Sequence, residues 1–154
     1  MAVSDSLGSW FNQTPDVSYR AISGLNWPGG KSIIPDFALE AGPIRLAVEY
    51  DGWWFHKSPK RRRVDWAKTK FLREAGFVVI RVRESPLPVM DLKRDLIVDP
   101  AMIYSGDVEG FQYLTEAVRN HVDMVCKCEF GIIWPNFLTE RAEATMLSTV
   151  PRLV

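Results

Sequence analysis

The sequence predicts a single α/β domain. Its 154 residues are enough for one domain with a hydrophobic core. Residues 44–51 and 77–83 are apolar, β-branched runs typical of strands, whereas residues 64–75 between them have apolar side chains at helical spacing. Strands and helices therefore alternate along the chain, as they do in α/β proteins.

The composition is that of a soluble globular protein, with 47% hydrophobic and 25% charged residues. No apolar run approaches the ~20 residues of a membrane span, so we expect no membrane partner. The N-terminus lacks the basic start and apolar core of a signal peptide, which favours a cytoplasmic location. The 19 basic and 19 acidic residues balance; this argues against coating nucleic acid by bulk charge but allows a local basic face.

In the N-terminal half, a short helix is expected over 4–13 and a Pro- and Gly-rich loop over 14–31. Residues 33–40 read as a strand, with Pro35 tolerable only near its start or at an irregularity. The turn at 41–43 then connects this strand to the strand over 44–51, so that the two form a hairpin.

Beyond this hairpin, we expect a basic loop over 57–63 and a helix over 64–75, whose apolar stripe includes Val64, Ala67 and Phe71. A strand over 77–83, a short strand over 95–99 and helices over 108–122 and 138–146 follow. We divide the chain into a main domain, 1–125, and a C-terminal extension, 126–154. Cys126 and Cys128 are expected to be reduced thiols, with a zinc ion shared across a dimer as the less favoured alternative.

Acidic residues gather where the central strands end. Glu49 and Asp51 lie two residues apart, so they should point to the same side of their strand, and Asp36 precedes them in the hairpin. These carboxylates match the oxygen ligands that Mg²⁺ or Mn²⁺ prefers. A metal and its bound water would then act on a phosphodiester, and the basic candidates that could assist are His56, Lys68 and Lys70. The plainer alternatives are a solvated strand end, a packed histidine and lysines on an exposed helix face.

Basic and aromatic residues follow the acidic group directly. The candidates for nucleic-acid contacts are Trp53, Trp54, Lys57, Lys60, Arg61, Arg62 and Arg63. Cations could hold a phosphate backbone over an acidic site, and an exposed aromatic ring could stack on a base. The alternative is a solvated basic loop whose neighbouring aromatic residues fill the core.

An ordered set of motifs carries a family resemblance. Pro35-Asp36-Phe37, Val48-Glu49-Tyr50-Asp51-Gly52 with His56, Asp65 with Lys68, and the run from Gly76 to Glu84 occur in that order. Together they resemble the restriction-endonuclease-like, or PD-(D/E)XK, superfamily, and within it the very-short-patch repair (Vsr)-like endonucleases. The resemblance covers about residues 33 to 99 and implies a central mixed β-sheet flanked by helices.

The resemblance also implies roles. Asp36 corresponds to the principal metal-binding aspartate, and His56 matches the catalytic histidine. Asp51 occupies the place of a polar active-site residue after the second strand, and with Glu49 it resembles the second acidic half of the signature. The signature lysine would stand at position 51, so Lys68 or Lys70 from the helix is expected to replace it.

Three functions are therefore open. The preferred one is a Mg²⁺- or Mn²⁺-dependent DNA endonuclease, acting alone, as a homodimer or with a targeting protein. The second is a catalytically inactive nuclease fold that binds DNA or another protein. The third is a structural or regulatory subunit that uses its aromatic surface and C-terminal tail.

Overall fold

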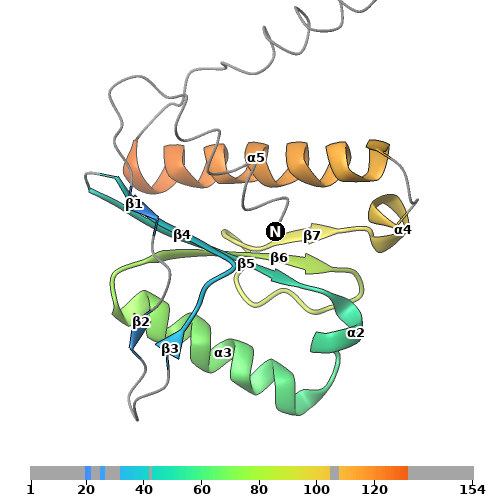
Figure 1. Ribbon diagram of the computed structural model, residues 1–154, viewed down its shortest axis with the longest axis horizontal. Coiled ribbons are helices and arrows are strands. Elements are labelled where there is room, and N and C mark those ends of the chain that lie inside the picture. Colours follow the sequence, from blue (N-terminus) through green and yellow to red (C-terminus); the bar gives the residue numbers. More distant parts are fainter. Residues whose placement is uncertain (1–19, 22–24, 27–31, 42, 105–107, 132–154) are drawn as a thin grey trace, which may run out of the picture.

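A mixed β-sheet with the strand order β1-β4-β5-β6-β7 forms the centre of the protein, in a computed structural model that describes residues 20–21, 25–26, 32–41, 43–104 and 108–131 (Figure 1). The β4 strand pairs antiparallel with both β1 and β5, whereas β5, β6 and β7 are parallel to one another. The strands of this sheet are β1 (Arg20–Ala21), β4 (Phe37–Ala41), β5 (Ile44–Asp51), β6 (Val78–Glu84) and β7 (Leu96–Val98). A separate two-stranded sheet pairs β2 (Leu25–Asn26) with β3 (Ser32–Ile33).

Helices cover both faces of the sheet (Figure 1). The helices are α2 (Trp53–His56), α3 (Pro59–Glu74), α4 (Pro100–Ile103) and α5 (Val108–Phe130). The α5 helix lies over one face, and α3 lies over the other as the crossover between the parallel strands β5 and β6. The α/β prediction is therefore confirmed. Among the described helices, none is both long and apolar enough to cross a membrane.

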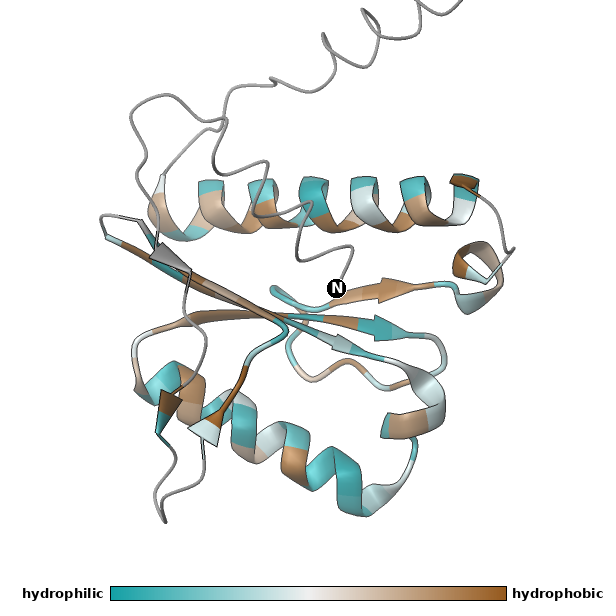
Figure 2. Cartoon of the chain, viewed as in Figure 1, coloured by the Kyte–Doolittle hydropathy of each residue, from teal (hydrophilic) through white to brown (hydrophobic). Residues whose placement is uncertain are grey.

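The main hydrophobic core lies between the sheet and α5. Leu114, Val118 and Val122 recur at helical spacing on the buried side of α5, and they pack against strand residues such as Leu46 and Ile80. Figure 2 shows this apolar side turned toward the sheet and the polar side turned away. The helix extends to Phe130, well beyond the predicted end at 122.

The opposite face of the sheet is packed differently, and the predicted apolar stripe of α3 is wrong. The buried residues of α3 are Asp65, Thr69 and Leu72, whereas Val64 is exposed. The reason is that the sheet face beneath α3 becomes charged toward the ends of its strands, where Glu49 and its neighbours are buried. A pattern search for apolar side chains cannot find a helix face that is buried on charged partners.

The predicted boundaries hold for the second strand of the hairpin but not for the basic segment. The β5 strand occupies 44–51 as expected and pairs with β4 in an antiparallel hairpin. In contrast, α3 begins at Pro59 rather than at 64, because Pro59 suits the first helical position and Ser58 caps it by accepting a hydrogen bond from Arg61 N at 3.2 Å. Most of the predicted basic loop is therefore the start of a helix.

Other expectations are corrected or lie outside the described residues. The strand expected over 33–40 is interrupted at 34–36, around Pro35, and continues as β4. The segment 14–31, expected to be a loop, contains β1 and β2. The helices predicted over 4–13 and 138–146 fall outside the described residues.

Candidate functional site

Asp36 and Glu49 are neighbours because of the hairpin register. Phe37 pairs with Val48, so Asp36, one residue before β4, lies beside Glu49 at the end of the ladder. The backbone N–H of Tyr50 donates to Asp36 Oδ2 at 2.7 Å and holds this carboxylate against β5. Asp36 itself is exposed to solvent. The site therefore has one accessible carboxylate and one buried carboxylate side by side.

The helix α3 adds a lysine to this pair. Lys68 Nζ donates to Glu49 Oε2 at 2.6 Å and to the carbonyl oxygen of Ile34 at 3.1 Å. Because an ammonium group has three N–H donors and the described residues accept from two of them, one remains for another acceptor. Lys68 therefore connects the irregular segment before β4 to the buried carboxylate of β5.

The other carboxylate oxygen of Glu49, Oε1, lacks a hydrogen-bond partner among the described residues. Glu49 is 3% exposed, and its Oε1 atom is itself buried. A buried, unpaired charged oxygen is costly, so an oxygen of this kind indicates a missing partner. A cation bound jointly by Glu49 Oε1 and Asp36 would supply that partner.

Electrostatics support the same interpretation. Burial raises the pKa of Glu49 above its ordinary value, although Lys68 and Arg81 oppose the effect, and the charge of Asp36 raises it further. A divalent cation would relieve both the desolvation of Glu49 and its repulsion from Asp36. Two carboxylates, of which Asp36 is open to water, suit a hard cation such as Mg²⁺ or Mn²⁺.

Asp51 belongs to a different group. Arg81 donates to both carboxylate oxygens of Asp51, with Nε at 2.7 Å from Oδ2, and Arg83 Nη1 donates to Oδ2 at 2.8 Å. These two arginines are almost completely buried. Asp51 shares the sheet face of Glu49, as the alternation predicts, but its oxygens are committed to guanidinium groups rather than to the Asp36–Glu49 pair.

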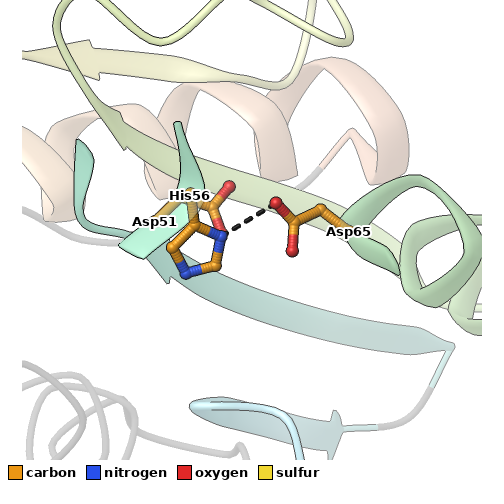
Figure 3. Close-up of side chains that lie close together, drawn as sticks. All are labelled: Asp51, His56 and Asp65. Atoms are coloured by element: carbon orange, nitrogen blue, oxygen red, sulfur yellow. Dashed lines mark hydrogen bonds and ion pairs between the residues drawn. The ribbon is translucent and has the colours of Figure 1, made fainter. Parts of the chain in front are cut away.

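His56 joins Asp51 to α3. Its Nδ1 atom lies 2.8 Å from Asp65 Oδ2 and 3.3 Å from Asp51 Oδ1 (Figure 3). Asp51, His56 and Asp65 each offer one ligand atom, all within 4.8 Å of one another, so the group could hold a metal ion. Arg81 and Arg83 already neutralise much of its negative charge. We therefore interpret it primarily as a buried ion network.

The network orients the imidazole of His56. A carboxylate can only accept hydrogen bonds, so Asp65 favours the tautomer with the proton on Nδ1 and the lone pair on Nε2. Although burial opposes it, the hydrogen bond from His56 and the nearby charge of Arg81 hold the pKa of Asp65 below its ordinary value. Asp65 therefore stays ionised and fixes a histidine whose Nε2 can accept a proton.

The aromatic candidates lie at the start of the helical segment. Trp54 is 68% exposed, whereas Trp53 is half-buried. Lys57 Nζ lies 3.5 Å from the ring centroid of Trp54 and 4.6 Å from that of Trp53, which is cation–π geometry. A flat aromatic surface is thus exposed to solvent with a cation beside it.

The remaining basic candidates, Lys60 to Arg63, lie at the start of α3. Lys60, Arg61 and Arg63 are exposed, Arg62 is partly buried, and the first turn contains no acidic residue. Positive charges are unfavourable near the positive end of a helix dipole. This concentration of cations lowers stability but attracts an anion such as a phosphate backbone.

Lys70 does not reach either group. Its side chain is 73% exposed and its Nζ atom lies 3.7 Å from Glu74 Oε1, one turn along the same helix. Of the two lysines considered from the sequence, the structure brings Lys68 to the carboxylates. The residues brought together are therefore Asp36, Glu49 and Lys68, with Asp51 and His56 in the adjoining network.

Three members of the network were absent from the residues proposed from sequence, namely Asp65, Arg81 and Arg83. A sequence signal for the arginines exists, because Arg81 and Arg83 alternate with the same period as Glu49 and Asp51, and the parallel register pairs them residue by residue. Asp65 precedes Lys68 by three residues, a spacing that places both on neighbouring parts of one helix side.

Neither a scan against models of protein families nor a search of curated proteins found a match to this chain.

Proposed function

We propose that this protein is a metal-dependent DNA endonuclease with a restriction-endonuclease-like fold. The single observation that carries the proposal is the Asp36–Glu49–Lys68 group, with a buried carboxylate oxygen that has no partner among the described residues. Two carboxylates and a lysine are the donor set that the PD-(D/E)XK resemblance implies, with the lysine supplied by a helix. The hairpin, the helical crossover and the parallel strands β5 and β6 suit the same fold.

The residues fit a divalent metal, which Asp36 and Glu49 would hold. When bound, Mg²⁺ or Mn²⁺ supplies charge neutralisation at the scissile phosphate and lowers the pKa of a coordinated water. Lys68 uses two of its three N–H groups within the described part of the protein, so the third can donate to a phosphate oxygen or to the attacking water. His56, oriented by Asp65, can accept a proton at Nε2.

The surface beside the site supports DNA as the substrate. Cations at the start of α3 would hold the phosphate backbone, and the exposed ring of Trp54 would contact bases. The cations lie between His56 and Lys68 in the chain, and Trp54 lies two residues before His56. Binding of the DNA backbone by these residues would therefore place a phosphodiester near the catalytic groups.

The test is nicking of supercoiled plasmid DNA in Mg²⁺, Mn²⁺ or EDTA. We expect nicking by the wild-type protein in Mg²⁺ or Mn²⁺, none in EDTA, and none by Asp36→Ala. The matched control is Glu116→Gln, an exposed carboxylate on α5 across the sheet, which should nick like the wild type. Equal nicking by Asp36→Ala would reject the site, and DNA binding without nicking would identify an inactive nuclease fold.

A metal-binding measurement gives an independent readout. Titration of Mn²⁺, followed by its electron paramagnetic resonance signal, should show binding by the wild type and by Glu116→Gln. Asp36→Ala should lose that binding whether or not DNA is present. Unchanged Mn²⁺ binding by Asp36→Ala would place the metal elsewhere, with the Asp51–His56–Asp65 group as the next candidate.

A further inference from the structure

A pocket of about 490 Å³ lies on the flank of α3 that faces away from Lys68. Its walls come from the first half of α3, including Arg62 and Trp66, and from the segment after β6, including Val89 and Met90. Arg62 and Trp66 share one flank of the helix because they are four residues apart, whereas Lys68 projects on another. The volume falls within the range of small-molecule sites and is sufficient for one nucleotide.

The inner end of the pocket holds an unsatisfied cation. Arg83 is fully buried, yet its Nε and Nη2 atoms have no hydrogen-bond partner in the described part of the chain. Its third nitrogen, Nη1, donates to Asp51 and contacts the sulfur of Met90. In Arg81 the corresponding Nε and Nη2 atoms donate one hydrogen bond each to the Asp51 carboxylate. The Nε–Nη2 edge of Arg83 therefore lacks an acceptor among the described residues, and a phosphate or a base carbonyl would supply one.

The walls combine positive charge with a flat ring. Arg62 and Arg63 line the pocket together with Arg83, and none of the described lining residues is acidic. Trp66 is 54% exposed, so its indole is available as a stacking surface. Val89, which is 41% exposed, contributes apolar surface from the segment after β6. Arginines beside an indole and an apolar contact suit a ligand that is both anionic and aromatic.

We propose that this pocket binds one unpaired nucleotide of the bound DNA strand. The base lies between Trp66 and the apolar wall, and the phosphate contacts Arg62 and Arg63, with Arg83 at the inner end. This inference rests on the proposed function, because it takes the ligand from DNA held along α3. It deepens that function by giving the protein a preference for DNA with an extruded base.

The test measures binding in EDTA, where no metal-dependent cleavage occurs. Fluorescence anisotropy compares a labelled duplex that has one bulged nucleotide with the same duplex fully paired. We expect the wild type to bind the bulged duplex roughly 5- to 100-fold more tightly, the range that one stacked base contributes. Trp66→Ala should lose this preference, whereas Phe111→Ala, an exposed aromatic residue on α5 that lies outside the pocket, should keep it.

A competition experiment distinguishes a nucleotide of the bound DNA from a free mononucleotide as the ligand. Free deoxyadenosine monophosphate should compete only weakly with the bulged duplex; tight binding of the mononucleotide without a preference for the bulge would overturn the proposal. A wild type without preference, or a Trp66→Ala variant that retains it, would also overturn it. Loss of nicking with the preference intact would reject the proposed function alone, and loss of the preference with nicking intact would reject the pocket alone.

Discussion

Substitution of Lys68 by methionine tests the physical basis of the site. The change removes the only described side chain that hydrogen-bonds Glu49 and leaves both oxygens of a nearly buried carboxylate unpaired. Breaking a fully buried ion pair costs about 3–5 kcal/mol. Because the Lys68 side chain is 21% exposed, water screens part of the pair and we expect about 2–3 kcal/mol at pH 8.

The loss should depend on pH. Burial already raises the folded-state pKa of Glu49, so ionised Glu49 destabilises the fold as pH rises above its unfolded value near 4.5. The charge of Lys68 opposes this rise in the pKa of Glu49. Without Lys68 the folded-state pKa rises further, so stability continues to fall with pH up to a higher pH. Protonated Glu49 needs no cation, so Lys68→Met should lose less stability at pH 5 than at pH 8.

Urea unfolding at both pH values measures this difference. Lys70→Met is the matched control, because Lys70 is exposed and should change stability by less than about 0.5 kcal/mol. Adding Glu49→Gln to Lys68→Met should restore most of the loss, because the unpaired charge is gone. Equal stability of the two methionine variants at pH 8, or a Lys68→Met loss that is the same at both pH values, would refute the reasoning.

Three further predictions concern the network, the DNA surface and the core. Asp65→Asn should slow nicking by up to about 100-fold because His56 loses the partner that fixes its tautomer. Because folding lowers the Asp65 pKa from its ordinary value of 3.8, the cost of the substitution in stability should be full above that pH and should decline as the pH falls below it toward the folded-state pKa. Lys57→Ala with Lys60→Ala should weaken DNA binding in EDTA and reduce the slope of log K against log salt by about 2. Leu72→Ala should lower the free energy of unfolding by about 2–5 kcal/mol, because Leu72 is completely buried.

Each of these predictions has a result that would contradict it. Nicking by Asp65→Asn at the wild-type rate would show that the His56 tautomer has no role in the reaction. An unchanged salt slope would place Lys57 and Lys60 outside the interface, provided that Lys93→Ala, an exposed lysine elsewhere, leaves the slope unchanged. A loss below about 1 kcal/mol for Leu72→Ala would mean that the α3 face packs less tightly than its burial indicates.

The strands were predictable because their side chains follow simple alternation. The apolar run over 44–51 reads as β5 from sequence, and its alternation correctly places Glu49 and Asp51 on one sheet face. Alternation says nothing about which partner each acid finds, and Asp51 instead binds two arginines from a strand that is adjacent only after the crossover. Long-range pairing of this kind is a property of the fold.

The helix α3 shows why the remainder could not be predicted. Its buried side contains Asp65 and Thr69, which no search for an apolar stripe would select. The sequence does contain a signal for the start at Pro59, because serine is a common N-cap residue and proline a common first residue of a helix. The run of charged residues that follows made this segment resemble a basic loop instead. The choice of Lys68 over Lys70 depends on the helix rotation, which the charged sheet face beneath it fixes.

The most direct test of the central claim is the rate of plasmid nicking by Glu49→Gln in Mg²⁺. Glutamine has the shape of glutamate and removes a buried charge, so the variant should fold while losing a metal ligand. We predict a fall in rate of at least about 100-fold, whereas Glu74→Gln, an exposed carboxylate on α3, should nick at the wild-type rate. Nicking by Glu49→Gln at the wild-type rate would contradict the assignment of Asp36, Glu49 and Lys68 as the catalytic site.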